Sequence, residues 1–232
     1  MPFLWFGDWT WIIILPALFF AMWAQSKVQS TYARYSRVPA RSRVSGAQVA
    51  REILNNAGLE EIGVERVAGQ LTDHYDPRKK VLRLSAGVYD SSSLAALGVA
   101  AHEAGHAIQH DLGYAPLVLR NQILPVAQFG SGLAFPLFFI GFIFSNTFGF
   151  LMDLGILFFL GAVIFQVVTL PVEFNASSRA LELLEASGFL TREEVGPTKR
   201  VLDAAAMTYV AATAVAVTQL LRLLVLRGMR DD

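Results

Sequence analysis

The feature that most constrains this chain is a long stretch that is almost free of charge. No Asp, Glu, Lys or Arg occurs between Arg120 and Asp153, or between Asp153 and Glu173. A helix that crosses a bilayer needs roughly 20 mainly apolar residues, so this stretch is too long for one span. Ser145-Asn146-Thr147 divides it, and we expect two helices, at about 123–144 and 148–170, joined by a tight loop. Residues 117–171 are therefore predicted to form a transmembrane hairpin.

Two further segments are apolar enough to enter a membrane. Trp9–Ala24 is one, and residues 1–24 are predicted as a first transmembrane helix. A signal peptide fits less well there, because the first 26 residues contain no Lys or Arg. Ala204–Leu221 is free of charge but rich in Ala and Thr, so residues 204–232 are predicted as a fourth transmembrane or membrane-associated helix with a short tail.

Composition agrees with an integral membrane protein and excludes other classes. Charged residues make up 16% of the chain, against about 25% in soluble proteins. The high apolar content excludes a disordered chain, and the absence of Cys excludes a disulfide scaffold. Lys+Arg and Asp+Glu balance at 19 each, which argues against nucleic acid as a partner.

The basic residues predict the orientation of the chain in the membrane. Eleven Lys and Arg lie between Lys27 and Arg83, and four more lie in residues 172–203. None precedes Trp9, and the Ser145–Thr147 loop has none. The positive-inside rule therefore places the N-terminus outside and both polar stretches in the cytoplasm. Arg227 and Arg230 argue weakly against a fourth span, which would send them outside.

Residues 25–116 are predicted to form the main cytoplasmic domain, of α+β type. Ser45-Gly46-Ala47-Gln48 is a capping-box sequence that begins a helix ending near Gly58. Leu71–Asp76 and Lys80–Ser85 predict a β-hairpin, because Leu82 and Leu84 alternate with Arg83 and Asp76-Pro77 opens a turn. A long helix is expected from about Ser92 to His110.

Residues 172–203 are predicted as a second cytoplasmic segment. Pro171 suits the first turn of a helix that runs through Leu184 and ends at Ser187-Gly188. Thr191 and Glu194 form another capping-box sequence. Gly196-Pro197 is expected to break the chain before the last long helix.

The chemistry is carried by His102-Glu103-Ala104-Gly105-His106, an HExxH sequence within the expected long helix. Positions four apart lie on one helix face, where two imidazoles can bind one Zn²⁺. Glu103 is rotated by about 100° from His102, so it can act as general base toward a water rather than as a ligand. Gly105 inside a helix costs about 1 kcal/mol relative to Ala, which suggests that another backbone packs close to it. The pattern predicts metal-assisted amide hydrolysis with one zinc per chain.

A catalytic zinc needs a third protein ligand, and His110, Glu173 and His74 are the candidates. His110 continues the row of His102 and His106, but its Cα lies about 12 Å along the axis from that of His102. Glu173 is preferred, because the predicted hairpin leaves the cytoplasm beside the His helix and returns there. Asn175, Ser177 and Arg179 follow Glu173 and are candidates to support the ligands from outside.

His74 and Tyr75 are candidates for substrate or oxyanion contacts. They lie in the first strand of the predicted hairpin, which as an edge strand would pair with an extended peptide. A purely structural role at the polar end of the hairpin remains the alternative.

These motifs together resemble those of the neutral zinc metallopeptidases of bacterial membranes, the YugP-like proteins, over nearly the whole chain. The resemblance rests on Leu71-Thr72-Asp73-His74-Tyr75-Asp76-Pro77, Val81-Leu82-Arg83-Leu84-Ser85, Ala100–Gln109 and Gly113-Tyr114-Ala115-Pro116-Leu117. It implies a bacterial inner-membrane protein with zinc on His102, His106 and Glu173 and with Glu103 as base. The layout is more distantly similar to the HtpX-like membrane proteases, which implies a role in membrane-protein quality control. Ser177 stands where those proteins carry Asp.

The sequence thus predicts a mainly α, integral membrane protein with three or four spans and a cytoplasmic zincin-like metallopeptidase domain of gluzincin type. That domain would combine the HExxH helix, the β-hairpin and the Glu-bearing helix. Its substrate would be a peptide or a membrane protein, and a homo-oligomer is left open. The alternative is a zinc-binding but proteolytically inactive membrane adaptor, for which Gly130, Gly132 and Gly141 would provide close helix contacts. A transporter is disfavoured, because few charges lie inside the spans.

Overall fold

The structure, a computed structural model, describes residues 9–230. The chain divides into two compact units. We call the first the helical unit; it contains the chain up to Ala24, residues 118–170, and the chain from Thr208 onward. The second, the mixed unit, contains residues 25–117 and 171–207. Residues 1–8 of the predicted first span and the last two residues of the predicted tail lie outside the described residues.

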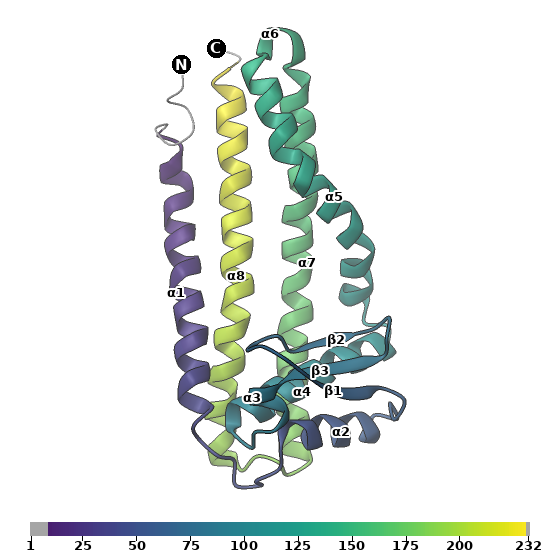
Figure 1. Ribbon diagram of the computed structural model, residues 1–232. Helices are drawn as coiled ribbons and strands as arrows, with labels where there is room; N and C mark the ends of the chain where they lie inside the picture. The colour runs from purple at the N-terminus through teal and green to yellow at the C-terminus, as the bar shows by residue number, and fades with distance from the viewer. Residues whose placement is uncertain (1–8, 231–232) are drawn as a thin grey trace. The chain divides into compact units, whose positions relative to one another are not determined.

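Four of the helices in the described part of the chain are long and apolar enough to cross a membrane, by length and composition (Figure 1). They are α1 (Trp11–Tyr35), α5 (Ala115–Ile143), α7 (Phe150–Ala186) and α8 (Arg192–Gly228). A short helix, α6 (Ser145–Phe148), connects α5 to α7 at the predicted polar divider. Ala204–Leu221, predicted as either a transmembrane or a membrane-associated helix, is thus part of a fourth candidate span.

Two helix boundaries that we predicted at proline are wrong. Pro171 lies inside α7 and Pro197 inside α8, and both helices continue through these residues. A proline in a helix interior lacks an N–H and costs roughly 3 kcal/mol locally. At Pro171 the nearby residues Thr169 and Val172 are buried. Near Pro197 the side-chain hydroxyl of Thr198 donates to the carbonyl of Glu194 and is fully buried.

Glycines bring α5 and α7 into close contact within the helical unit. A Cβ atom at Gly155 would lie 2.6 Å from the carbonyl oxygen of Ala134 and 2.8 Å from the backbone nitrogen of Phe138. A Cβ atom at Gly141 would lie 2.6 Å from the backbone nitrogen of Met152. Phe138 and Met152 are themselves buried in the apolar cluster of this unit. The predicted hairpin is therefore packed backbone to backbone.

Three arginines near the end of α8 are engaged with other helices of the helical unit. Arg222 is only 7% exposed; its Nε donates to the hydroxyl of Thr10, and its guanidinium lies over the ring of Trp11. Arg227 forms an ion pair with Asp153, Nε to Oδ1 2.9 Å. Arg230 lies over the ring of Phe142. The basic residues that argued weakly against a fourth span thus interact within the chain.

The mixed unit contains a small sheet with the order β1-β3-β2. The strands are β1 (Gly63–Val67), β2 (His74–Asp76) and β3 (Val81–Ser85). The antiparallel pair of β2 and β3 confirms the predicted β-hairpin. We did not predict β1, which runs parallel to β3. Its residues are mostly exposed and lack a clear apolar alternation, so sequence pattern gave little signal for it.

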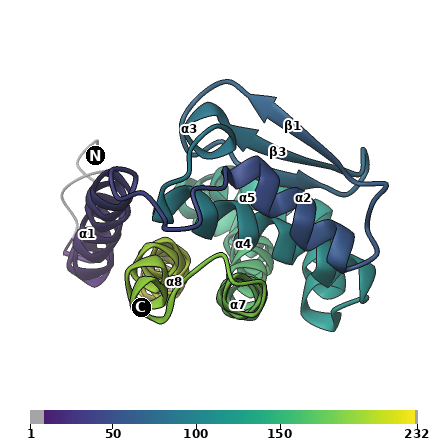
Figure 2. The ribbon, with the colours of Figure 1, turned by 90° about the horizontal axis from the view of Figure 1, so that it is seen from below.

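The mixed unit also contains the helices α2 (Gly46–Asn56), α3 (Ala86–Tyr89) and α4 (Leu94–Asp111), and parts of α1, α7 and α8 (Figure 2). The capping box predicted for α2 is present, with the Ser45 side chain and the Gln48 side chain each bonded to the other residue's backbone. The Ser93 side chain caps α4 and accepts from the backbone N–H of Ala96. One face of α4 enters an apolar core that includes Ile53, Leu82, Leu84, Leu97 and Ala104. His102 and His106 lie on the opposite face of α4.

Candidate metal centre

His102 and His106 of α4 and Glu173 of α7 form a cluster in the mixed unit that could hold a metal ion. Each residue offers one ligand atom, and the three atoms lie within 4.8 Å of one another. The carboxylate oxygen Oε2 of Glu173 is 3.3 Å from Nε2 of His102 and 3.6 Å from Nε2 of His106. The Glu173 side chain is 3% exposed, whereas both imidazoles are partly accessible.

The helix spacing explains why both imidazoles face Glu173. His102 and His106 are four residues apart, and their ring centroids are 4.7 Å from each other. Ala101, Ala104 and Ile108 occupy the other side of α4 and are buried in the apolar core. Burial of that side fixes the rotation of α4 and turns the imidazoles toward α7.

Gly105 allows α4 and α7 to approach closely beside the cluster. A Cβ atom at this position would lie 3.1 Å from the carbonyl oxygen of Ala176 and 3.5 Å from its Cα. Both atoms belong to the backbone of α7, three residues beyond Glu173. The backbone that the sequence led us to expect against Gly105 is therefore that of Ala176.

Each imidazole has a neighbour at its second nitrogen. The hydroxyl of Ser177 is 3.1 Å from Nδ1 of His102. The carbonyl oxygen of the Gln109 side chain is 3.0 Å from Nδ1 of His106, and because that oxygen can only accept, Nδ1 carries the proton. Nε2, the nitrogen that faces Glu173, is then left with its lone pair free for a metal.

The predicted supporting residues Asn175 and Arg179 are linked to His106 through Gln109. The amide nitrogen of Gln109 donates to the side-chain oxygen of Asn175 at 2.9 Å and to the carbonyl of Val172 at 2.8 Å. Nε of Arg179 donates to the same oxygen of Asn175 at 2.8 Å. Gln109 was not among our candidate site residues, because an amide in an apolar helix gives no sign of its partners on a distant helix.

The electrostatics of the cluster favour a positive charge between the three side chains. Burial lowers the pKa of His106, but the hydrogen bond to Glu173 and the charges of Glu103 and Glu173 more than offset it. The pKa of His106 therefore lies above its ordinary value. The negative charge that raises this pKa also attracts a cation to the space between the imidazoles and the carboxylate.

The donor set fits zinc. Zn²⁺ binds His nitrogen and carboxylate oxygen at about 2.0–2.2 Å, so two ligand atoms of a tetrahedral site are about 3.3–3.5 Å apart. The two distances from the Glu173 oxygen to the imidazole nitrogens, 3.3 and 3.6 Å, match this spacing. Two His and one carboxylate would leave the fourth position open, as in catalytic zinc sites.

The remaining candidates lie around α4 at different places. Glu103 is partly accessible, one residue after His102. His110 lies beyond the cluster, with Nδ1 3.4 Å from the hydroxyl of Tyr75. Tyr75 packs on the side of the sheet that faces the core, whereas His74 is paired with Arg83 and points to the other side. The structure thus brings Tyr75, but not His74, toward α4.

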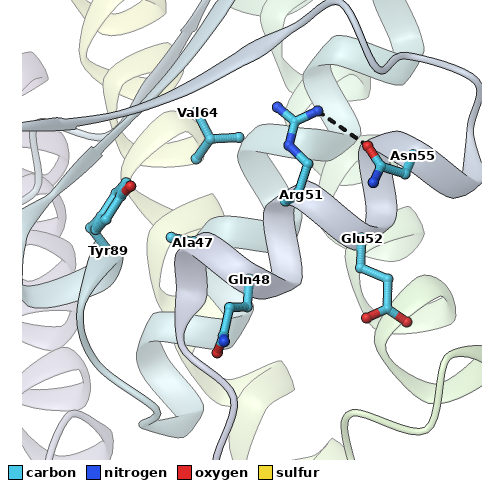
Figure 3. A pocket seen from close by; sticks show the side chains of 7 residues that line it. All are labelled: Ala47, Gln48, Arg51, Glu52, Asn55, Val64 and Tyr89. Atoms are coloured by element: carbon cyan, nitrogen blue, oxygen red, sulfur yellow. Dashed lines mark hydrogen bonds between the residues drawn. The ribbon is translucent and has the colours of Figure 1, made fainter.

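A hollow of about 500 Å³ lies elsewhere in the mixed unit, over α2, β1 and Tyr89 (Figure 3). Arg51 lines it, but the guanidinium is bonded to the side chain of Asn55 and to the backbone carbonyls of Glu60 and Ile62. No residue of the metal cluster lines this hollow. The hollow is therefore not part of the candidate metal centre.

The fold and the cluster together define a class: a helical membrane protein with a site formed by the two His of an HExxH helix and a Glu of another helix. Comparison with known proteins agrees with this class. The family described as "Putative neutral zinc metallopeptidase" matches residues 10–228, and the chain belongs to this family. The chain is 48% identical over 221 residues to "Putative membrane protease YugP" of Bacillus subtilis (strain 168), covering 95% of this chain and 97% of that protein. No solved structure gives a significant match.

Proposed function

We propose that the protein is a zinc-dependent endopeptidase of the bacterial inner membrane, with a zincin-like domain of gluzincin type. The observation that carries this proposal is the spacing of the Nε2 atoms of His102 and His106 around one carboxylate oxygen of Glu173. The family to which the chain belongs supports a peptidase, and the relative from Bacillus subtilis supports a membrane protease.

The roles of the residues follow from their positions. His102, His106 and Glu173 would hold one zinc ion per chain, which supplies Lewis acidity toward a water and a peptide carbonyl. Glu103 accepts the proton of the attacking water and passes it to the nitrogen of the leaving amine. Ser177 and Gln109 hold the two imidazoles with Nε2 turned to the metal position. The bond that breaks is the amide bond of the substrate.

The substrate in this proposal is an extended peptide segment, either free or part of a membrane protein. β2 pairs with β3 on one side only and is an edge strand, so a peptide can add to its other side. Tyr75 faces α4 and is better placed than His74 to donate a hydrogen bond to the oxyanion. Burial and the charges of Glu61, Asp111 and Asp76 raise the pKa of Tyr75, which keeps its hydroxyl protonated.

The proposed orientation places the N-terminus outside and the metal centre at the cytoplasmic face. It rests on the basic residues between Lys27 and Arg83 and the positive-inside rule. The ion pair of Arg227 with Asp153 supports it, because it reduces the net positive charge that a fourth span would carry outward. A role in membrane-protein quality control is part of this proposal and rests only on the distant similarity to HtpX-like proteases.

The rival proposal is a metal-binding adaptor without peptidase activity. Two of the glycines that suggested it contact α7 of the same chain: Cβ atoms at Gly130 and Gly141 would meet Phe158 and Met152. Only Gly132 of the three has open space around it. These glycines are therefore explained by packing within the hairpin.

Glu103→Gln separates the two proposals. The variant keeps the three metal ligands and loses the general base. We expect wild-type protein in detergent to cleave unfolded casein, and Glu103→Gln to bind zinc equally but to lose activity by at least about 10²-fold. Equal cleavage by wild type and Glu103→Gln would contradict the proposed mechanism.

A further inference from the structure

The Gln109 side chain is the most enclosed polar group next to the candidate metal centre. It is 0% exposed, although it lies on the same helix as His102 and His106. A buried amide without partners costs about 1–3 kcal/mol for each unpaired group. The side-chain oxygen of Gln109 accepts one hydrogen bond, and its amide nitrogen donates two. These three bonds compensate for its burial.

These three bonds connect two ligand-bearing helices. The carbonyl oxygen of Gln109 accepts from His106 on α4. Its amide donates to the backbone of Val172 and to the side chain of Asn175 on α7. Val172 and Asn175 lie one residue before and two residues after Glu173. One side chain therefore fixes the ring of one ligand and the segment that carries another.

The donor–acceptor direction of these hydrogen bonds also selects the tautomer of the His106 imidazole. With Val172 and Asn175 both offering acceptor oxygens, the nitrogen of the Gln109 amide must face α7. Its oxygen must then face His106 and can only accept a proton there. Asn175 is held in the matching orientation, because its oxygen also accepts from Arg179. Donation thus runs from His106 to Gln109 and from Gln109 to Asn175, whose oxygen also accepts from Arg179.

We propose that Gln109 is a positioning residue of the metal centre, which holds His106 with Nε2 toward the metal and sets the spacing between α4 and Glu173. This inference rests on the metal site of the proposed function. Residues that bond to ligating imidazoles in this way affect metal affinity by about 10- to 100-fold when they are changed. A residue that only fills the core would change stability without a specific effect on the metal.

The test compares three variants with wild type, using Co²⁺ and Zn²⁺ alone as probes on the full chain in detergent. Gln109→Met keeps the volume and removes all three bonds. Asn175→Ala removes one of the three bonds of Gln109, together with the bond from Arg179 to Asn175, and leaves the bond to His106. Thr198→Val is the matched control, since it removes a buried hydrogen bond of the mixed unit that does not reach the cluster. Metal affinity is measured by chelator competition well below the unfolding temperature, and the visible Co²⁺ spectrum reports coordination.

We expect Gln109→Met to lower the affinity for Zn²⁺ by about 10- to 100-fold and to alter the Co²⁺ spectrum. Asn175→Ala should lower the affinity by about 2- to 10-fold, the effect of one neutral hydrogen bond. Thr198→Val should bind as wild type does. If Gln109→Met does not fold, Asn175→Ala carries the test.

Three negative outcomes are distinguishable. If wild type binds metal and Gln109→Met binds it as tightly with the same Co²⁺ spectrum, the positioning role is overturned and the metal site stands. An unchanged affinity in Asn175→Ala would likewise overturn the link to α7. If wild type itself binds neither metal, the proposed function fails as well.

Discussion

Gly105→Ala tests whether the closeness of α4 and α7 sets the metal site. The new Cβ would lie 3.1 Å from the carbonyl oxygen of Ala176, whereas ordinary Cβ contacts are 3.4 Å or longer. The contact is with backbone, which cannot rotate away, so the helices must part by about 0.3 Å. Ligands need to be held within about 0.5 Å of their working positions, so a shift of this size uses most of the tolerance.

Stability and metal affinity should respond differently to this change. Alanine gains about 1 kcal/mol of helix propensity over glycine, and overpacking costs about 1–3 kcal/mol. The net loss of unfolding free energy is then between about 0 and 2 kcal/mol. We expect Zn²⁺ affinity to fall by about tenfold in Gly105→Ala, and further in Gly105→Val, because the separation of the ligands increases with side-chain size.

Chelator competition and thermal unfolding in detergent measure the two quantities separately. Gly161→Ala is the control, because Gly161 is also helical and a Cβ there meets nothing within 4 Å. It should leave Zn²⁺ affinity unchanged. Equal Zn²⁺ affinities in Gly105→Ala, Gly161→Ala and wild type would refute the reasoning from helix spacing.

Two further predictions concern stability. Gly155→Ala should lower the unfolding free energy of the helical unit by about 1–3 kcal/mol, because its Cβ would meet backbone atoms at 2.6 and 2.8 Å. A detergent titration followed by circular dichroism measures this. Gly161→Ala on the same helix should not lower it, and equal stabilities of the two variants would contradict the tight packing. Removing the metal should lower stability by about 2.7 kcal/mol relative to free Zn²⁺ at 100 times its Kd, as measured by thermal unfolding with and without chelator. Glu173→Ala should show little of this dependence, and a full dependence in that variant would argue against its role as a ligand.

The sequence was most informative where local chemistry decides the structure. The capping box at Ser45 and Gln48 and the hairpin around Pro77 depend on residues close in sequence, and both are present. The candidate spans were visible because charge is excluded over long stretches. The family resemblance was also visible, since the HExxH motif and its neighbours are contiguous.

The sequence was misleading where packing outweighs local preference. Proline often begins or ends a helix, yet α7 and α8 continue through Pro171 and Pro197, and residues next to both prolines are buried. β1 has few apolar residues, and it is ordered by pairing with the buried strand β3. Gln109 could not be identified, because its role depends on acceptors on α7 more than 60 residues away.

The number of zinc ions per chain tests the central claim most directly. It is measured by mass spectrometry of metals on detergent-purified wild type, Glu173→Ala and His110→Ala, prepared without chelators. His110 is the matched His outside the cluster, since it contacts Tyr75 instead. We predict about one zinc per chain in wild type and in His110→Ala, and far less in Glu173→Ala. No zinc in wild type, or full zinc in Glu173→Ala, would contradict the site formed by His102, His106 and Glu173.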